Sequence, residues 1–144
     1  MKKSLIVLAV AASIVVAGFV GVAQGQKAKE VVYVSSEKAI YTPRPGGGPS
    51  MHILRGDPDK GSHATFTKFE PGFDAGIHTH TNDVSLVVIK GAYLYKDDDG
   101  EKRVGPGDYL FIPGGHKHWS GGDKTEGALF YQEGPAKFDL VPAK

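Results

Sequence analysis

The chain contains no cysteine among its 144 residues. Its fold therefore cannot rely on disulfides, which stabilise many exported domains, and it cannot be anchored through a lipidated cysteine. Neither sign of charge prevails, with 17 Lys and Arg against 16 Asp and Glu. This balance excludes the dense basic surface of a nucleic-acid-binding protein. The basic residues are also scattered, which argues against binding to an anionic membrane surface.

A secretory signal peptide is predicted over residues 1–25. Lys2 and Lys3 precede an uncharged apolar stretch at residues 4–23, and small and polar residues follow at 24–26. This is the positive, apolar and small-residue order of a cleaved signal. We therefore expect an exported protein, periplasmic or secreted. The alternative is an uncleaved anchor, because the stretch is near the length that spans a bilayer.

The rest of the chain reads as short strands between turns, with no amphipathic helix, internal repeat or second domain. We expect an arm over residues 26–50 and one barrel domain over residues 51–144. Residues 41–49 are too rich in Pro and Gly for a regular element, and they suggest a flexible arm or a lid. The expected strands are 31–34, 51–55, 63–70, 84–89, 92–95, 102–104, 109–112, 128–132 and 138–141. A small antiparallel β-barrel or jelly roll accommodates such a pattern.

Three histidines form the most informative feature of the sequence. In an extended segment, His78 and His80 project to the same face and Thr79 to the opposite face. His118 follows a turn rich in Gly and Pro. Together these imidazoles predict a single metal site, with coordination positions left open for a substrate.

The spacing of these residues resembles that of the cupin superfamily, whose two sequence motifs occur here in the right order. The first motif matches Gly72, His78, His80 and Gly91, and the second matches Gly107, Pro113, Gly115 and His118. The match extends from Gly72 to about Gly122, a third of the chain. The resemblance implies an all-β, single-domain cupin β-barrel, a jelly roll or double-stranded β-helix. It also implies one divalent transition metal per chain, whether Fe, Zn, Cu, Mn or Ni.

The chain departs from both cupin motifs. The Glu ligand of the first motif would fall at Val84, which cannot bind a metal, and the Asn of the second falls at Gly122. Asp83 and Ser85 flank Val84, but on a regular strand both face away from the imidazoles. A bulge could still bring Asp83 inward as a replacement ligand or as the acidic catalytic group.

The other candidate residues lie outside the group of three histidines. We interpret His116 as a loop residue supporting the site, and His52 and His63 as ordinary strand or surface residues. The acidic run at residues 97–99 is expected to be a solvated hairpin tip rather than a calcium loop. Five aromatic residues either wall the pocket or belong to the plain barrel core: Tyr93, Tyr95, Phe111, Trp119 and Tyr131.

Three functions are compatible with this sequence. The first, which we favour, is a mononuclear metal-dependent enzyme, most simply an oxygenase acting on a small organic acid or diketone. The second is a non-catalytic metal-binding, ligand-binding or sensor cupin, and the third is a metal-free barrel. The fold itself does not decide among them. Expected partners are a small-molecule substrate and, through the segment before Met51, a second copy of the chain. We expect no nucleic acid partner, and no membrane association after signal cleavage.

Overall fold

A computed structural model describes residues 30–144, so the predicted signal peptide at residues 1–25 lies outside the described chain. Within residues 30–144 the regular elements are all β-strands, and no helix is long and apolar enough to cross a membrane. The strands are β1 (Thr42–Pro43), β2 (Ser50–Gly56), β3 (His63–Phe69), β4 (Asp74–Thr79), β5 (Val84–Gly91), β6 (Tyr93–Asp97), β7 (Gly100–Val104), β8 (Tyr109–Ile112), β9 (His118–Gly122), β10 (Ala128–Gly134) and β11 (Val141–Pro142).

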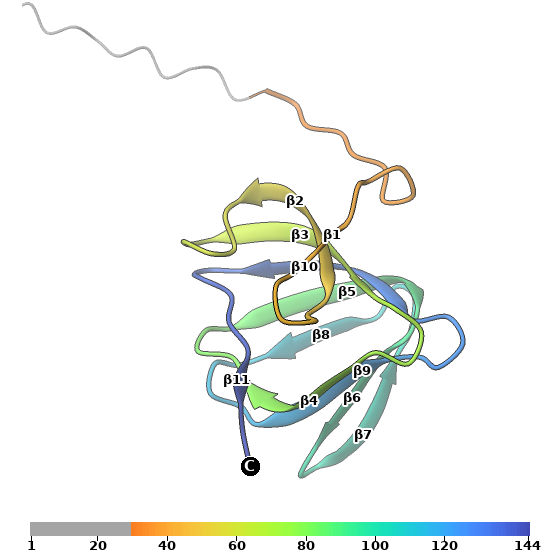
Figure 1. Cartoon of the computed structure of the whole chain (residues 1–144), viewed down its shortest axis with the longest axis vertical. Helices are drawn as coiled ribbons and strands as arrows, with labels where there is room; N and C mark the ends of the chain where they lie inside the picture. Colours follow the sequence, from red (N-terminus) through yellow and green to blue (C-terminus); the bar gives the residue numbers. More distant parts are fainter. Residues whose placement is uncertain (1–29) are drawn as a thin grey trace, which may run out of the picture. The chain divides into compact units, whose positions relative to one another are not determined.

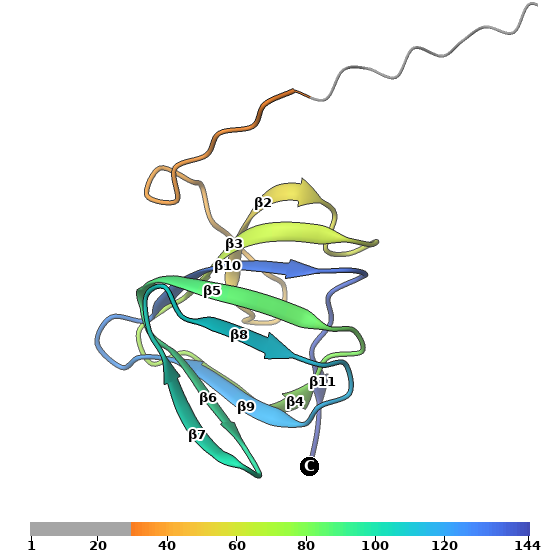
Figure 2. The same cartoon turned by 180° about the vertical axis from the view of Figure 1, so that it is seen from behind.

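The strands form two antiparallel sheets that face each other (Figures 1 and 2). The larger sheet has the order β1-β2-β3-β10-β5-β8, and the smaller has the order β11-β4-β9-β6-β7. Consecutive strands therefore often belong to opposite sheets, as in a jelly roll. This arrangement confirms the expected all-β cupin barrel.

Three differences from the predicted strands have local causes. Residues 31–34 form no strand despite their β-branched sequence, because they have no neighbouring strand to pair with. The segment rich in Pro and Gly contributes β1, a two-residue strand that pairs with Met51 and Ser50 of β2. Strand β9 was not predicted, since Ser120, Gly121 and Gly122 carry little strand propensity and are held by their two neighbours.

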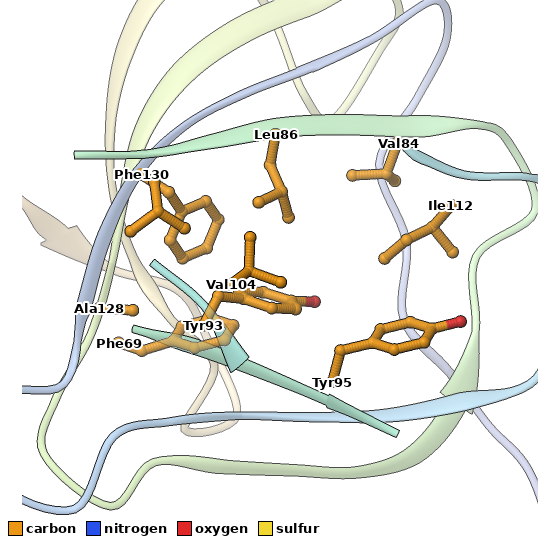
Figure 3. Packing of buried hydrophobic residues seen from close by; sticks show 10 residues of the cluster. Phe69, Val84, Leu86, Tyr93, Tyr95, Val104, Ile112, Ala128 and Phe130 are labelled. Atoms are coloured by element: carbon orange, nitrogen blue, oxygen red, sulfur yellow. The ribbon is translucent and has the colours of Figure 1, made fainter. Parts of the chain in front are cut away.

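Inward-facing side chains fill the space between the sheets (Figure 3). Phe69 packs edge-on against Phe130 at 5.0 Å between ring centroids and stacks on Tyr93 at 5.3 Å. Val84 and Ile112 lie toward the other end of this core. The apolar core therefore fills the interior between the two sheets and extends up to the histidines described below.

Gly91, the closing glycine of the first motif, is required by the backbone. Its φ of 70° lies in the left-handed region that favours glycine. A Cβ added there would also meet the carbonyl oxygen of Gly127 at 2.3 Å. That same carbonyl accepts a hydrogen bond from the N–H of Ala92 at 2.9 Å, which ties the turn between β5 and β6 to the start of β10.

Replacing Phe130 by Ala should lower the free energy of unfolding by about 3–5 kcal/mol, because this ring is completely buried and a cavity would remain. Urea unfolding monitored by circular dichroism measures the loss. The control is Phe111→Ala, which removes a ring that is 49% exposed and should cost about 1 kcal/mol or less. Equal losses in the two variants would contradict the assignment of the core.

Candidate metal centre

The structure brings His78, His80 and His118 together at one end of the barrel. His78 on β4 is directly opposite His118 on β9, and His80 follows the end of β4. Ring centroids lie 4.3 Å apart for His78 and His118, 4.9 Å for His78 and His80, and 5.3 Å for His80 and His118. All three side chains are buried, and one ring nitrogen from each lies within 4.8 Å of the others.

A backbone carbonyl sets the tautomer of each ring. The Nδ1 atoms donate to these carbonyls: His78 to Gly76 at 2.9 Å, His118 to His116 at 3.0 Å, and His80 to Asp139 at 2.5 Å. Since a carbonyl can only accept, Nδ1 carries the proton and Nε2 keeps its lone pair. Nε2 of His118 is buried without a hydrogen-bond partner among residues 30–144. These three nitrogens fit a divalent transition metal.

Burial lowers the pKa of all three imidazoles below the ordinary value of 6.5. The carbonyl contacts act in the opposite direction but are the smaller effect. The rings are therefore neutral at neutral pH, the form that binds a metal. Among the described residues, no carboxylate joins this group of three.

Tyr95 and Asp97 form a second layer behind His118. The ring of Tyr95 stacks on the imidazole at 5.3 Å, and its hydroxyl donates to Oδ2 of Asp97 at 2.8 Å. Nε2 of His116 also contacts this carboxylate oxygen at 3.1 Å. Burial raises the pKa of Tyr95, and the two contacts lower the pKa of Asp97 to about 2. The side chain of Asp97 is only 8% exposed, whereas Asp98 and Asp99 are exposed, so the predicted solvation of the acidic tip fails only at Asp97.

Residues 137–140, which follow β10 in the chain, lie against the three-histidine site. The carboxylate of Asp139 accepts hydrogen bonds from the backbone N–H of Thr81 at 2.8 Å and from its hydroxyl at 2.5 Å. The ring of Phe138 lies 5.1 Å from that of His80. This segment was predicted as a strand over 138–141, but pairing starts only at Val141. Its contacts with the site are long-range, so no local sequence pattern indicates them.

A cavity of about 20 Å³ adjoins His78 and His80. Aromatic and aliphatic side chains provide most of its wall, including Phe73, Phe138 and Leu140. A much larger hollow of about 720 Å³ lies beside Ile77 and Trp119 and is not lined by the three histidines. A third hollow, of about 150 Å³, is bordered by His118 together with Asp97 and Trp119. The imidazoles therefore border the small cavity through His78 and His80, and this hollow through His118.

Two of the five candidate pocket aromatics lie beside the site. Tyr93 lines the small cavity, and Tyr95 stacks on His118. Burial raises the pKa of Tyr93 to about 12, and Ser120 is its side-chain hydrogen-bond partner. Both side chains are also part of the apolar core. Tyr93 and Tyr95 are therefore part of the barrel core and also lie beside the site.

The other three aromatics do not line the cavity beside His78 and His80, and of these only Trp119 borders a hollow shared with a site histidine, His118. Phe111 is half-exposed, the indole N–H of Trp119 donates to Asp74, and the hydroxyl of Tyr131 donates to Glu133. Their neighbours along the strand face inward. Phe111 precedes Ile112, Trp119 lies between His118 and Ser120, and Tyr131 lies between Phe130 and Gln132. Alternation along the strand therefore turns these rings outward.

Asp83 is exposed and lies outside the group of three histidines. Its Oδ1 accepts a hydrogen bond from the N–H of Gly114 at 2.8 Å, so the carboxylate holds a loop. Val84 faces the cavity instead, and the hydroxyl of Ser85 contacts that of Tyr109 at 3.2 Å. No bulge at the start of β5 brings Asp83 inward, and neither flanking residue occupies the place of the missing Glu.

His63, expected to be an ordinary strand or surface residue, is buried. Its Nδ1 lies 3.0 Å from the carbonyl oxygens of both Gly61 and Ala136, and its Nε2 has no partner among residues 30–144. His52 contacts the carbonyl of Ile40 at 3.1 Å. His63 therefore supports the turn before β3 and the segment after β10.

The metal-free protein should lose stability as the pH falls below 6.5. Unfolded histidines take up protons there, whereas the folded rings, with their lowered pKa values, do not. Urea unfolding in the presence of a chelator, at about pH 7.5 and about pH 5.5, measures the change. Replacing all three histidines by Asn should flatten the slope, and an equally steep slope in that variant would contradict this origin.

Comparisons with known proteins are consistent with the geometry. The family model of the ChrR cupin-like domain matches residues 29–137. A 58-residue stretch is 33% identical to an (R)-mandelonitrile lyase of Granulicella tundricola, covering 40% of this chain and 44% of that protein. The chain thus spans under half the length of this curated relative.

Solved structures share the fold at low sequence identity. The polyketide cyclase RemF of Streptomyces resistomycificus matches with a TM-score of 0.66 and 18% identity, covering 80% of this chain and 87% of that one. ChrR of Rhodobacter sphaeroides, in complex with SigE, matches with a TM-score of 0.54 and 20% identity. The match covers 68% of this chain and 50% of that one. With the family model matching most of its length, this chain belongs to the ChrR cupin-like family of the cupin superfamily.

Proposed function

We propose that the protein is an exported, metal-dependent enzyme acting on a small oxygen-bearing organic substrate, such as an organic acid or a diketone. The observation that carries this proposal is the convergence of three buried, neutral imidazoles with free Nε2 atoms. Nε2 of His118 is buried without a partner among residues 30–144, which is unfavourable for a polar group in a packed core. His78, His80 and His118 would hold the ion.

A bound divalent ion would supply a positive charge that polarises a substrate oxygen, and iron would add oxidative chemistry. The chain itself contributes orientation and an apolar wall. The carbonyls of Gly76, His116 and Asp139 fix the rings, while Phe138 and Leu140 line the cavity with apolar side chains. Since no carboxylate joins the three histidines in the described chain, the site retains its positive charge and favours an anionic or enolisable substrate.

Two reaction classes follow from different observations. The similarity to a lyase supports making or breaking a bond next to a polarised carbonyl. The three-histidine ligand set, shared with metal-dependent cupin dioxygenases, supports an oxygenase. A non-catalytic ligand-binding or sensor role is the second candidate function, favoured by the match to the ChrR cupin-like family.

Purified protein should contain about one transition metal ion per chain, and His118→Ala should lose most of it because one of three ligands is missing. Plasma emission spectrometry measures the content. The matched control is His116→Asn, which leaves its backbone carbonyl in place and should keep the metal. Metal retained in full by His118→Ala would refute the ligand assignment.

Oxygen consumption in the presence of small organic acids or diketones then separates the reaction classes. Iron-dependent uptake would identify an oxygenase, and substrate conversion without uptake would identify the lyase class. Metal binding with neither would favour the ligand-binding role.

Export is proposed on the strength of residues 1–25 alone. Expressed with its natural N-terminus in a Gram-negative host, the protein should appear in the periplasm with a mature chain beginning near Gln26. Mass spectrometry of the fractionated protein measures this. An uncleaved chain in the membrane fraction would support the anchor instead. Pairing of two copies through residues 26–50 stays a prediction that light scattering checks.

A further inference from the structure

Gln132 carries a buried polar group that the fold does not use. It faces inward from β10 and is only 4% exposed. Its amide nitrogen, Nε2, has no hydrogen-bond partner among residues 30–144. Folded proteins leave few buried N–H groups unpaired, and each such group calls for an explanation.

The position of Gln132 connects it to the metal centre. It lines the same cavity as His78 and His80. On β10 it is opposite Leu86 of β5, and Val84, two residues earlier on β5, lines this cavity too. Val84 stands where the first cupin motif has its Glu. The amide of Gln132 thus lies one diagonal step, across two neighbouring strands, from the position of the missing carboxylate.

The other polar groups of this cavity are already engaged. Nδ1 of both His78 and His80 donates to a backbone carbonyl, and Ser120 is the side-chain partner of Tyr93. Gln132 therefore offers an amide donor that has no partner among residues 30–144, and the imidazole Nε2 atoms offer the metal ligands.

We propose that Nε2 of Gln132 donates a hydrogen bond to an oxygen of a small carboxylate or carbonyl ligand held at the three-histidine centre. This inference rests on the proposed metal site and adds a residue that selects the ligand. A cavity of about 20 Å³ holds little more than one water molecule, so the acceptor must belong to a compact group. A ligand without an acceptor there would leave the amide unpaired, and sites that require a hydrogen bond discriminate strongly against such analogues.

The test uses Co²⁺-loaded protein and formate, a carboxylate with three heavy atoms, followed by the visible absorption of the metal. Gln132→Met keeps the shape of the side chain and removes the donor. We expect formate to bind about tenfold more weakly to this variant, with Co²⁺ affinity unchanged. The matched control is Tyr131→Phe, which removes a polar group from the outer face of the same strand and should leave formate affinity unchanged.

A second measurement needs no variant at Gln132. In Zn²⁺-loaded protein the side-chain amide signal of Gln132 should shift in ¹⁵N–¹H spectra on addition of formate. Equal formate affinity in wild type and Gln132→Met, or an amide signal that does not move, would overturn the inference. Failure of the wild type to bind Co²⁺ or Zn²⁺ would instead overturn the proposed metal site, so the two failures are distinguishable.

Discussion

The pairing of β4 with β9 is the constraint on which the site depends. It sets His78 opposite His118, and a shift of one residue would turn one imidazole toward solvent. Each of these two rings is fixed by a carbonyl two residues earlier in its own chain segment, Gly76 for His78 and His116 for His118. The same local arrangement on two adjacent strands thus prepares two ligands from backbone geometry alone.

His80 is held differently. Its carbonyl comes from Asp139, and the carboxylate of that residue binds Thr81. The third ligand is therefore oriented by a segment that also places Phe138 over the cavity. Ligand geometry and closure of the cavity are coupled through residues 137–140, so a disturbance of this segment affects both.

The interior of the barrel combines an apolar core with a polar site. Phe130 belongs to the core, and Phe69 of the same core also lines the cavity beside the imidazoles and Gln132. Asp97 contacts both Tyr95 and His116 behind His118, and its charge also acts on His118 through space. A neutral ligand set without a carboxylate, facing a neutral amide, suits a positive ion and an anionic or carbonyl ligand. The fold alone hosts many reactions, so this polar site is what narrows the function.

The sequence by itself determined the barrel class and the three histidines. Strand alternation and motif spacing can be read from residues that lie close together in the chain, without knowing which strands pair. It also determined that Val84 cannot replace the missing Glu. Only the tertiary structure decided which side chains share the cavity. Phe111, Trp119 and Tyr131 face outward, and Gln132 faces inward, because the registers of β8, β9 and β10 with their neighbours set these directions. The contacts of residues 137–140 join positions more than fifty residues apart in the chain, a distance over which no local pattern carries information.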